Sequence, residues 1–428
     1  MTLVAFVADD FTGATDALWQ FRRFGLSGSL VTDVTHLHDR DDVIGIATTA
    51  RASADPVASA LPALRAVAAL GPLAVQYKVC STFDSSPGHG SIGAVIAALH
   101  REGLARGAVP VLAAQPEFGR YTWFANHFVR AGEEVVRLDR YPPTRDHPVT
   151  PATEADLRVR LAEQGAGRTG WLPAGASQEE YAARRSDAAV VADAMTEAHL
   201  VAFGRLLLTA AGRRAPHLGE GAAHPGGVPE AGGGALYCVG SGGLSYSLAA
   251  ALTSGRPARG GATLGAAGPV LVVSGSRSPV TARQIDAAER AGWTVLDAAD
   301  GLDAIAHAEA SLREGRHTIV QSTRGPSRDP AGVGESLGRV AAAAVRAGLV
   351  RRLVVAGGDT SGQVVAALGA RALDVVGTLA VGGPVCVLAS DDPACDGLEV
   401  ALKGGQVGGE DFFLSAASGS GPRPARGR

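Results

Sequence analysis

Lysine is almost missing from this chain: of its 39 basic residues only two are lysines, Lys78 and Lys403. An excess of either charge is also lacking, since the formal net charge is -3 at pH 7. A general nucleic-acid binder needs a basic face to neutralise phosphates, so we expect no nucleic-acid partner. No apolar run approaches the roughly 20 residues that span a bilayer, so we expect no membrane partner either.

Cysteine is scarce and scattered. No CxxC pair occurs, which argues against a zinc site and predicts no dedicated metal-binding cluster. Reduced, unpaired thiols are typical of cytoplasmic proteins. The N-terminus runs directly into "LVAFVADD" without a basic region or a cleavage site, so we predict a cytoplasmic protein. The four cysteines are Cys80, Cys238, Cys386 and Cys395.

Strand-like and helix-like segments alternate along most of the chain. The chain has 428 residues, of which 46% are hydrophobic and 19% are charged. A chain of this length is too long for one ordinary core, which predicts two domains. The alternation predicts an α/β fold in which each domain has a mainly parallel sheet flanked by helices. We predict a first domain at 1–255 with a Gly/Pro-rich loop near 212–235, a second domain at 268–415, and a disordered tail at 416–428.

In open parallel sheets ligands bind beyond the carboxyl ends of strands, and "ADDFTGATD" follows the first predicted strand. Two adjacent carboxylates, Asp9 and Asp10, suit hydroxyl recognition, metal coordination or proton abstraction from an alcohol. Alternatively, one of them caps the following helix and the other is solvated. Arg51, which ends "GIATTAR", has the geometry to pair with a substrate carboxylate, or it is an ordinary surface arginine.

A glycine-rich turn follows the predicted strand "RRLVVA". Gly357 and Gly358 let the backbone approach a ligand closely, and Asp359, Thr360 and Ser361 open a helix. The free N–H groups and the dipole of that helix start form a natural anion site, although Asp359 or Thr360 would alternatively serve only as a cap. No GxxxxGK[ST] segment exists, which excludes a Walker-type loop, and no GxGxxG follows the first strand, which disfavours a dehydrogenase.

Both lysines lie in small-residue loops, "QYKVCSTFDSS" and "ALKGGQVGG". An ammonium approaches phosphate as a point charge that a guanidinium does not replace without cost. The alternative is chance placement. His89 and His127 have no partners at metal-ligand spacing, and we interpret both as structural.

Taken together, these loops resemble the motifs of the four-carbon acid sugar kinase family over nearly the whole chain. "ADDFTGATD" and "YKVCSTFDSSPGHGSIG" resemble signatures of its substrate-binding N-terminal domain. "HPVTPATEADL", "VVADAMTEAHL" and "GSGGLSYSLAAAL" are similar to later segments. "VVSGSRSPVTARQI", "VVAGGDTSGQV" and "ALKGGQVGGEDFF" resemble its nucleotide-binding C-terminal domain.

The resemblance implies a kinase that uses ATP to phosphorylate the terminal hydroxyl of a threonate-, erythronate- or 3-oxo-tetronate-type acid, in a cleft between the two domains. It places acid-sugar binding at Asp10, Arg51, Ser81, Thr82, Phe83 and Asp84. It places ATP binding at Ser274, Gly357, Gly358, Asp359, Thr360 and Gly404. From the chemistry of the same loops we add Asp9 and Lys78 on the acid side, and Gly275, Ser276, Ser361 and Lys403 on the ATP side.

The expected cofactors are ATP and Mg²⁺, the expected partner is a small acid sugar, and the family suggests a homodimer. Asp359 is our first choice for the catalytic base, and Asp10 is its rival. Two other functions fit an α/β protein with these loops: a two-domain small-acid-binding protein and an NAD-dependent oxidoreductase. The sequence does not indicate which acid sugar is used.

Overall fold

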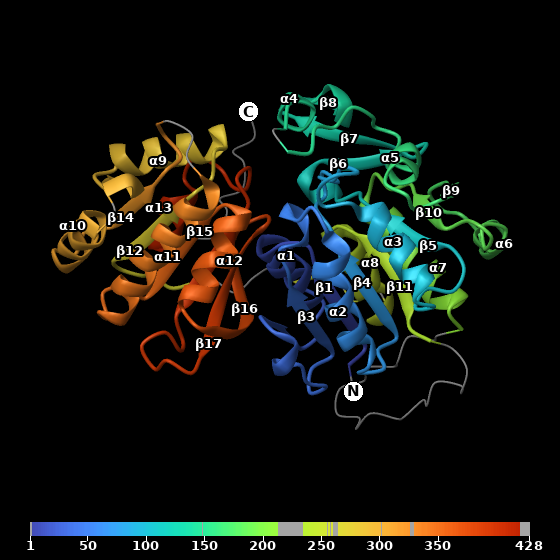
Figure 1. Cartoon of the computed structure of the whole chain (residues 1–428), viewed down its shortest axis with the longest axis horizontal. Helices are drawn as coiled ribbons and strands as arrows, with labels where there is room; N and C mark the ends of the chain where they lie inside the picture. The colour runs from blue at the N-terminus through green and yellow to red at the C-terminus, as the bar shows by residue number, and fades with distance from the viewer. Residues whose placement is uncertain are drawn as a thin grey trace. The chain divides into compact units, whose positions relative to one another are not determined.

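The computed structural model describes residues 2–147, 149–212, 234–254, 256, 258–259, 264–300, 302–325 and 329–419. The chain forms two compact units. In Figure 1 unit 1 runs from blue to yellow-green and unit 2 from yellow to red, except that two blue N-terminal segments belong to unit 2. Those two segments, Asp10–Trp19 and Ser29–His36, belong to unit 2 together with Gly260–Arg428. Unit 1 comprises Met1–Asp9, Gln20–Gly28 and Leu37–Arg259.

The described part of unit 1 is built on seven parallel strands in the order β3-β1-β4-β11-β5-β10-β9. These strands are short and nearly all buried, as expected for a parallel sheet covered on both faces. The predicted α/β fold is therefore confirmed here. The strands are β1 (Val4–Ala8), β3 (Val43–Ala47), β4 (Ala74–Lys78), β5 (Val109–Leu112), β9 (Thr169–Leu172), β10 (Ala189–Ala192) and β11 (Leu236–Gly240).

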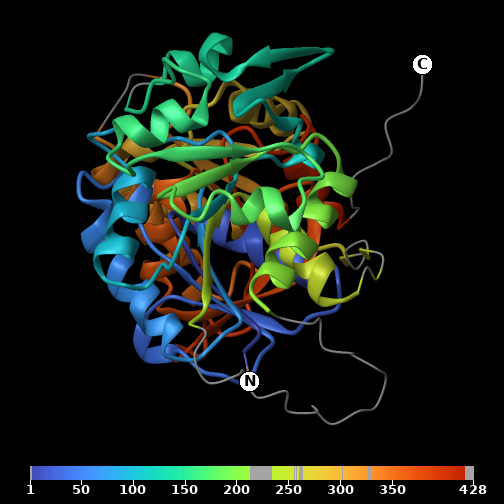
Figure 2. The same ribbon diagram turned by 90° about the vertical axis from the view of Figure 1, so that its right-hand side faces the viewer.

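Helices cover both faces of this sheet. Figure 2 shows α2 (Pro56–Ala68) and α3 (Ile92–Arg101) in blue and cyan on one side, with α7 (Glu197–Ala210) and α8 (Gly242–Leu252) on the other. Helix α5 (Leu157–Glu163) contacts α3, and the short α6 (Gln178–Ala182) contacts α7. Helix α1 (Phe11–Arg22) begins directly after β1.

A small antiparallel sheet in unit 1, absent from our predictions, consists of β6 (Arg120–Trp123), β7 (Asn126–Ala131) and β8 (Glu134–Arg137). Phe124 and Ala125 form the first turn with φ of 53° and 60°. A two-residue turn with positive φ usually carries Asn or Gly, so this sequence gives no hairpin signal. The carboxylate of Asp193 holds the turn by accepting the N–H groups of both residues at 2.8 and 3.0 Å. Helix α4 (Pro142–Arg145) follows the sheet.

The described part of unit 2 has the strand order β13-β14-β12-β15-β18-β17-β16-β2. The first five strands of this order are parallel, and the β16–β17 hairpin brings in antiparallel pairing, so the prediction of a mainly parallel sheet is again confirmed. The strands are β2 (Gly28–Val31), β12 (Val270–Ser274), β13 (Thr294–Asp297), β14 (Thr318–Gln321), β15 (Arg352–Ala356), β16 (Ala370–Ala380), β17 (Gly383–Ser390) and β18 (Glu399–Lys403).

In unit 2, α11 (Pro330–Arg346) packs against both α10 (Leu302–Arg313) and α12 (Gly358–Ala367). Helix α9 (Pro279–Arg290) contacts α13 (Phe412–Ser418) over a shared apolar core. The predicted tail from 416 is wrong at its start, because Ala416 follows Phe412 and Phe413 on one buried face of α13. Residues 420–428 and most of the Gly/Pro-rich loop, 213–233, lie outside the described residues.

Single-turn 3₁₀ helices complete the described elements: Val34–His36, Ala50–Ala52, Pro116–Phe118, Leu138–Arg140 and Ala298–Asp300. Among the described residues, no helix combines the length and the apolar character that crossing a membrane requires.

Candidate functional site

The glycine turns of unit 2 meet at one edge of its sheet. Strands β12, β15 and β18 are neighbouring and parallel, so the loops that follow them leave the sheet side by side. The N–H of Gly357 donates to Lys403 O at 3.0 Å, and the N–H of Ser276 donates to Ala356 O at 3.1 Å. The structure thus brings together the three loops that sequence reasoning had assigned to the nucleotide.

Glycine is required at these turns because side chains from the neighbouring loops fill the space of a Cβ atom. A Cβ on Gly275 would overlap with Thr360 Oγ1, and one on Gly405 would lie 2.7 Å from Ser276 Oγ. Gly357 has φ of 124°, which side chains rarely adopt. At Gly275 and Gly405 the loops therefore pack more closely than any residue with a Cβ atom would allow.

Helix α12 begins at Gly358, and its N-cap is Gly357, which offers no side chain to the first-turn N–H groups. Asp359 and Thr360 lie inside the first turn, so neither is the cap that our alternative interpretation proposed. Thr360 and Ser361 are buried and Asp359 is exposed. The first-turn N–H groups and the positive end of the helix dipole make this end of α12 suitable for an anion.

Asp10 lies at the same helix start. A Cβ on Gly358 would be 3.0 Å from Asp10 Oδ2. Its carboxylate accepts the N–H of Gly13 at 2.6 Å and the hydroxyl of Thr12 at 2.7 Å, so Asp10 does cap α1. The side chain is only 6% exposed.

Asp9 is not solvated, so the alternative in which one aspartate caps the helix and the other is exposed to water is wrong for Asp9. It is 2% exposed and receives two bonds from Arg51, from Nη2 at 2.6 Å and from Nε at 3.2 Å. Arg51 is thus not an ordinary surface arginine, and its bidentate contact is with Asp9. Strand β4 brings Lys78 to this edge of unit 1, where Asp9 donates its N–H to Lys78 O at 2.9 Å.

The loop after β4 carries the remaining acid-side candidates. Ser81 and Thr82 are largely buried, and Phe83 is fully buried with φ of 55°. Lys78 is also buried, with Nζ 3.1 Å from Val79 O. The structure therefore gathers Asp9, Arg51 and Lys78 at the carboxyl edge of unit 1, next to the start of this loop.

Lys403 lies beneath the glycine turns of unit 2. Its ammonium donates to Thr281 Oγ1 at 3.0 Å and lies 5.7 and 5.9 Å from the ring centres of Phe412 and Phe413. Thr281 in turn donates to Gly405 O at 2.9 Å. Burial lowers the pKa of Lys403 to about 7, because the charged form loses its hydration.

One loop of this edge was missed by sequence reasoning. Thr323, which follows β14, forms a 2.7 Å hydrogen bond between its hydroxyl and that of Ser274. Arg277 donates to Ser322 O at 2.8 Å and to Gly325 O at 3.0 Å. The signal was available, since "QSTRG" places small polar residues directly after an apolar strand.

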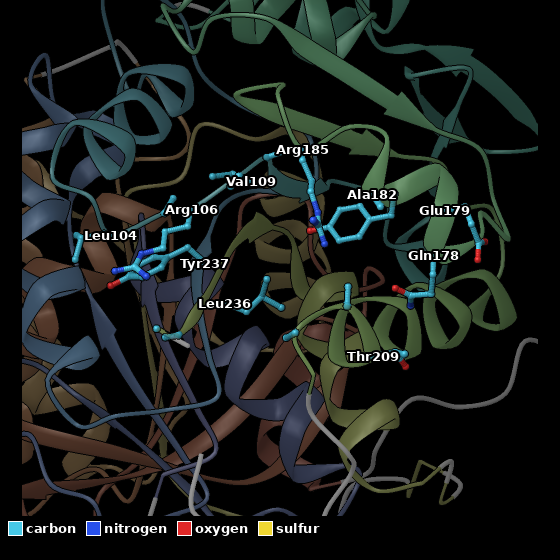
Figure 3. A pocket seen from close by; sticks show the side chains of 18 residues that line it. Leu104, Arg106, Val109, Gln178, Glu179, Ala182, Arg185, Thr209, Leu236 and Tyr237 are labelled. Carbon is cyan, nitrogen blue, oxygen red and sulfur yellow. The ribbon is translucent and has the colours of Figure 1, made fainter. Parts of the chain in front are cut away.

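A pocket of about 800 Å³ lies at the opposite edge of unit 1, by the amino ends of β5 and β11 (Figure 3). Arg106 and Tyr237 lie at one end of it, and Gln178 and Glu179 of α6 at the other. None of the predicted site residues lines this pocket. The predicted residues described above lie instead at the carboxyl edges of the sheets, and we place the candidate site there.

Comparison with protein families gives a match for each part of the chain. Residues 4–224 match the model of a sugar-binding N-terminal domain, and residues 271–413 match that of a nucleotide-binding C-terminal domain. The chain belongs to the four-carbon acid sugar kinase family. The glycine turns lie in the part that matches the nucleotide-binding domain of this family, and Asp9, Arg51 and Lys78 lie in the sugar-binding part.

Named relatives resemble this chain over nearly its whole length. A 3-oxo-isoapionate kinase of Paraburkholderia graminis is 35% identical and covers 96% of this chain and 93% of its own. A 3-oxo-tetronate kinase of Pseudomonas fluorescens is 33% identical, with 97% and 96% covered. A solved structure from Salmonella typhimurium LT2 has the same fold, with a TM-score of 0.74, 24% identity, and coverage of 97% and 99%.

Proposed function

We propose that this protein is an ATP-dependent kinase that phosphorylates the terminal hydroxyl of a four-carbon or closely related acid sugar. The observation that carries the proposal is the meeting of three glycine turns at the start of α12, whose N-cap is Gly357, next to the end of the strand that carries Lys403. The relatives named 3-oxo-tetronate kinase and 3-oxo-isoapionate kinase support the acceptor class.

ATP would bind with its phosphates at the start of α12. The first-turn N–H groups point along the helix axis towards an anion there, and the bare glycine backbone permits close approach. Lys403 would add a positive point charge for a phosphate oxygen. Its ammonium is linked to the glycine turn by Thr281, which accepts a hydrogen bond from Lys403 and donates one to Gly405 O. Ser274, Gly275, Ser276, Thr360, Ser361 and Gly404 complete the proposed nucleotide contacts.

The acid sugar would bind at the carboxyl edge of unit 1. The Asp9–Arg51 pair offers acceptors for hydroxyl groups and a guanidinium for the carboxylate of the acid. Lys78 and the Ser81–Asp84 loop would supply the remaining polar contacts. Alignment of the two substrates is a large part of what a protein contributes to phosphoryl transfer, because the bonds that form and break belong to the substrates.

We assign the catalytic base to Asp359 and the orientation of the acceptor hydroxyl to Asp10. Asp359 is exposed in the first turn of α12, where an anionic phosphate would bind. Both carboxylate oxygens of Asp10 already accept hydrogen bonds from Thr12 and Gly13, which leaves this group less suited to take a proton.

Mg²⁺ would accompany the nucleotide and neutralise charge that develops on its phosphates. The described residues contain no cluster of three His, Cys, Asp or Glu side chains arranged as a metal cage. Mg²⁺ usually keeps several waters and binds through phosphates and one or two carboxylates. Asp10, whose carboxylate lies at the start of α12, is the candidate for that role.

The test is ADP release from ATP and Mg²⁺ with a panel of threonate, erythronate, 3-oxo-tetronate and 3-oxo-isoapionate. We expect ADP release with at least one acid, and a product whose phosphorus NMR signal is split by the two protons of a terminal CH₂. Tight binding of an acid without ADP release would favour a small-acid-binding protein. An absorbance change with NAD would favour an oxidoreductase.

A further inference from the structure

The Ser81–Asp84 loop adopts a backbone conformation that its own sequence does not favour. Phe83 has φ of 55°, a left-handed conformation that bulky side chains rarely adopt, and it is completely buried. Such a conformation persists only when the surroundings hold it in place. The contacts that hold it come from residues far along the chain.

Arg160, on helix α5, binds two carbonyl groups of this loop. Its Nη2 donates to Phe83 O at 3.1 Å and to Ser85 O at 2.9 Å, one on each side of Asp84. Arg160 is only 5% exposed. A single nitrogen of the guanidinium thus fixes the spacing of the Phe83 and Ser85 carbonyls, directly after the backbone torsion that is strained at Phe83.

His127, on strand β7, binds a third carbonyl. Its Nε2 lies 2.7 Å from Ser81 O, and its Nδ1 lies 3.0 Å from Thr122 Oγ1. Because a carbonyl oxygen only accepts, Nε2 must carry the hydrogen and Nδ1 must accept from Thr122. Burial lowers the pKa of His127 to about 3, so the ring is neutral and its one N–H is committed to Ser81.

A second layer secures the end of the loop. Gln164 donates to Ser85 Oγ at 2.9 Å, and Ser85 Oγ donates to Phe83 O at 3.1 Å. Gln164 is itself held by the N–H of Gly93, the second residue of α3, at 3.0 Å. The loop is therefore tied to α3, α5 and β7 together.

Charge is organised around the same loop. Burial lowers the pKa of Arg120 and of Arg160, and the carboxylate of Asp84 is among the groups that oppose this shift in both. Two largely buried cations therefore compensate Asp84.

We infer that Arg160 and His127 act as a clamp that positions the Ser81–Asp84 loop for binding of the acid sugar. Both are positioning residues, because they act through the loop backbone. The inference rests on the proposed function and extends the acid site to residues outside the family motifs that we identified in the sequence.

The first test does not depend on activity. In Arg160→Met, the amides of the peptide that spans Ser81–Ser85 should exchange hydrogen at least about tenfold faster, because two charge-assisted hydrogen bonds are lost. Arg158→Met is the matched control: it lies on the same helix but pairs with Asp156 and should leave the loop unchanged. Unchanged exchange in Arg160→Met would overturn the clamp.

The second test concerns the acid. Arg160→Met should raise the KM for the acid about tenfold to a hundredfold, with the KM for ATP unchanged within about twofold. Arg160→Lys keeps the charge but lacks the planar fork and should behave like Arg160→Met. If lysine restores the parental KM, charge alone positions the acid and the clamp is wrong. Faster loop exchange with an unchanged acid KM would make the contacts merely structural.

Ser85→Ala guards against a variant that does not fold. It removes only the hydroxyl that joins Gln164 to Phe83, and we expect a rise of about threefold in the acid KM. No rise in this variant, with Arg160→Met unfolded, would also overturn the inference. Failure of the proposed function looks different: the parent protein would release no ADP with any acid, whatever the exchange of the loop shows.

Discussion

Asp10 and Gly358 lie against each other, with Asp10 Oδ2 3.0 Å from the position that a Cβ on Gly358 would occupy. The contact joins the carboxylate after β1 to the first residue of α12, 348 positions later. An alanine at 358 would press on the Asp10 carboxylate, which would have to shift. Gly358, the second glycine of "GGDTSG", therefore makes room for Asp10 of "ADDFTGATD" as well as forming part of its own turn.

Gly358→Ala should lower kcat/KM for the acid by about tenfold, because the new methyl group displaces the Asp10 carboxylate. In an Asp10→Ala background the same substitution should cost less than about twofold, since the displaced group is gone. Steady-state kinetics of the four variants in this cycle measure the coupling. Equal costs in both backgrounds would show that Gly358 is needed for the nucleotide alone.

Asp359→Asn and Asp10→Asn should separate the two carboxylates at the start of α12. We expect Asp359→Asn to lower kcat by about a hundredfold to ten-thousandfold, as loss of a general base does, with both KM values little changed. Asp10→Asn should mainly raise the KM for the acid. Near-normal turnover of Asp359→Asn would exclude it as the base and favour Asp10.

Lys403 should make ATP binding take up a proton. Its pKa is lowered to about 7 by burial, so near that pH the Lys403 side chain is only partly protonated in the protein without ATP. A bound phosphate favours the ammonium, so the KM for ATP should rise as the pH increases above about 7. Calorimetry in buffers of different ionisation enthalpy measures the uptake, and Lys403→Met should abolish it. Uptake that persists in this variant would assign the proton elsewhere.

The same lysine should affect the free energy of unfolding. Its pKa is lowered in the folded chain and ordinary in the unfolded chain, so between about pH 7 and about pH 10 the unfolded state binds more protons. The contribution of Lys403 to stability therefore increases with pH across this window and is least favourable below it. Lys403→Met should accordingly stabilise the protein at pH 6 and lose that advantage towards pH 10. Denaturant unfolding at both pH values measures the difference.

Gly275→Ala should raise the KM for ATP by about tenfold or more, because its Cβ would overlap with Thr360 Oγ1. Gly265→Ala is the matched control, since a Cβ there meets nothing within 4 Å. Combining Gly275→Ala with Thr360→Ser should recover part of the affinity, because serine can turn its hydroxyl away without the extra methyl. No recovery would indicate that the backbone of the turn itself has shifted.

The sequence predicts the α/β fold and the gathering of the glycine turns because both follow from local rules. A buried run followed by small polar residues marks the carboxyl end of a strand, and parallel neighbours bring such ends together. The same rule identifies Lys78 and Lys403 as residues at strand ends. It also covers the loop at Ser322 and Thr323, which we overlooked.

Other features depend on tertiary contacts that no local pattern carries. Arg160 and His127 reach the Ser81–Asp84 loop from 46 or more positions away, and nothing in their own segments marks them. The hairpin turn at Phe124 and Ala125 lacks the usual turn residues, because Asp193 supplies the stabilisation instead. Arg51 could be predicted to form a bidentate pair, but not to form it with Asp9.

The clamp has a consequence for protein engineering. The short motif "STFD" looks like a portable recognition element, yet its carbonyl groups are oriented by β7 and α5, which the motif does not contain. Grafted alone onto another scaffold, these four residues would relax to an ordinary turn. Transplanting acid recognition would require the segment through Gln164 to move with it.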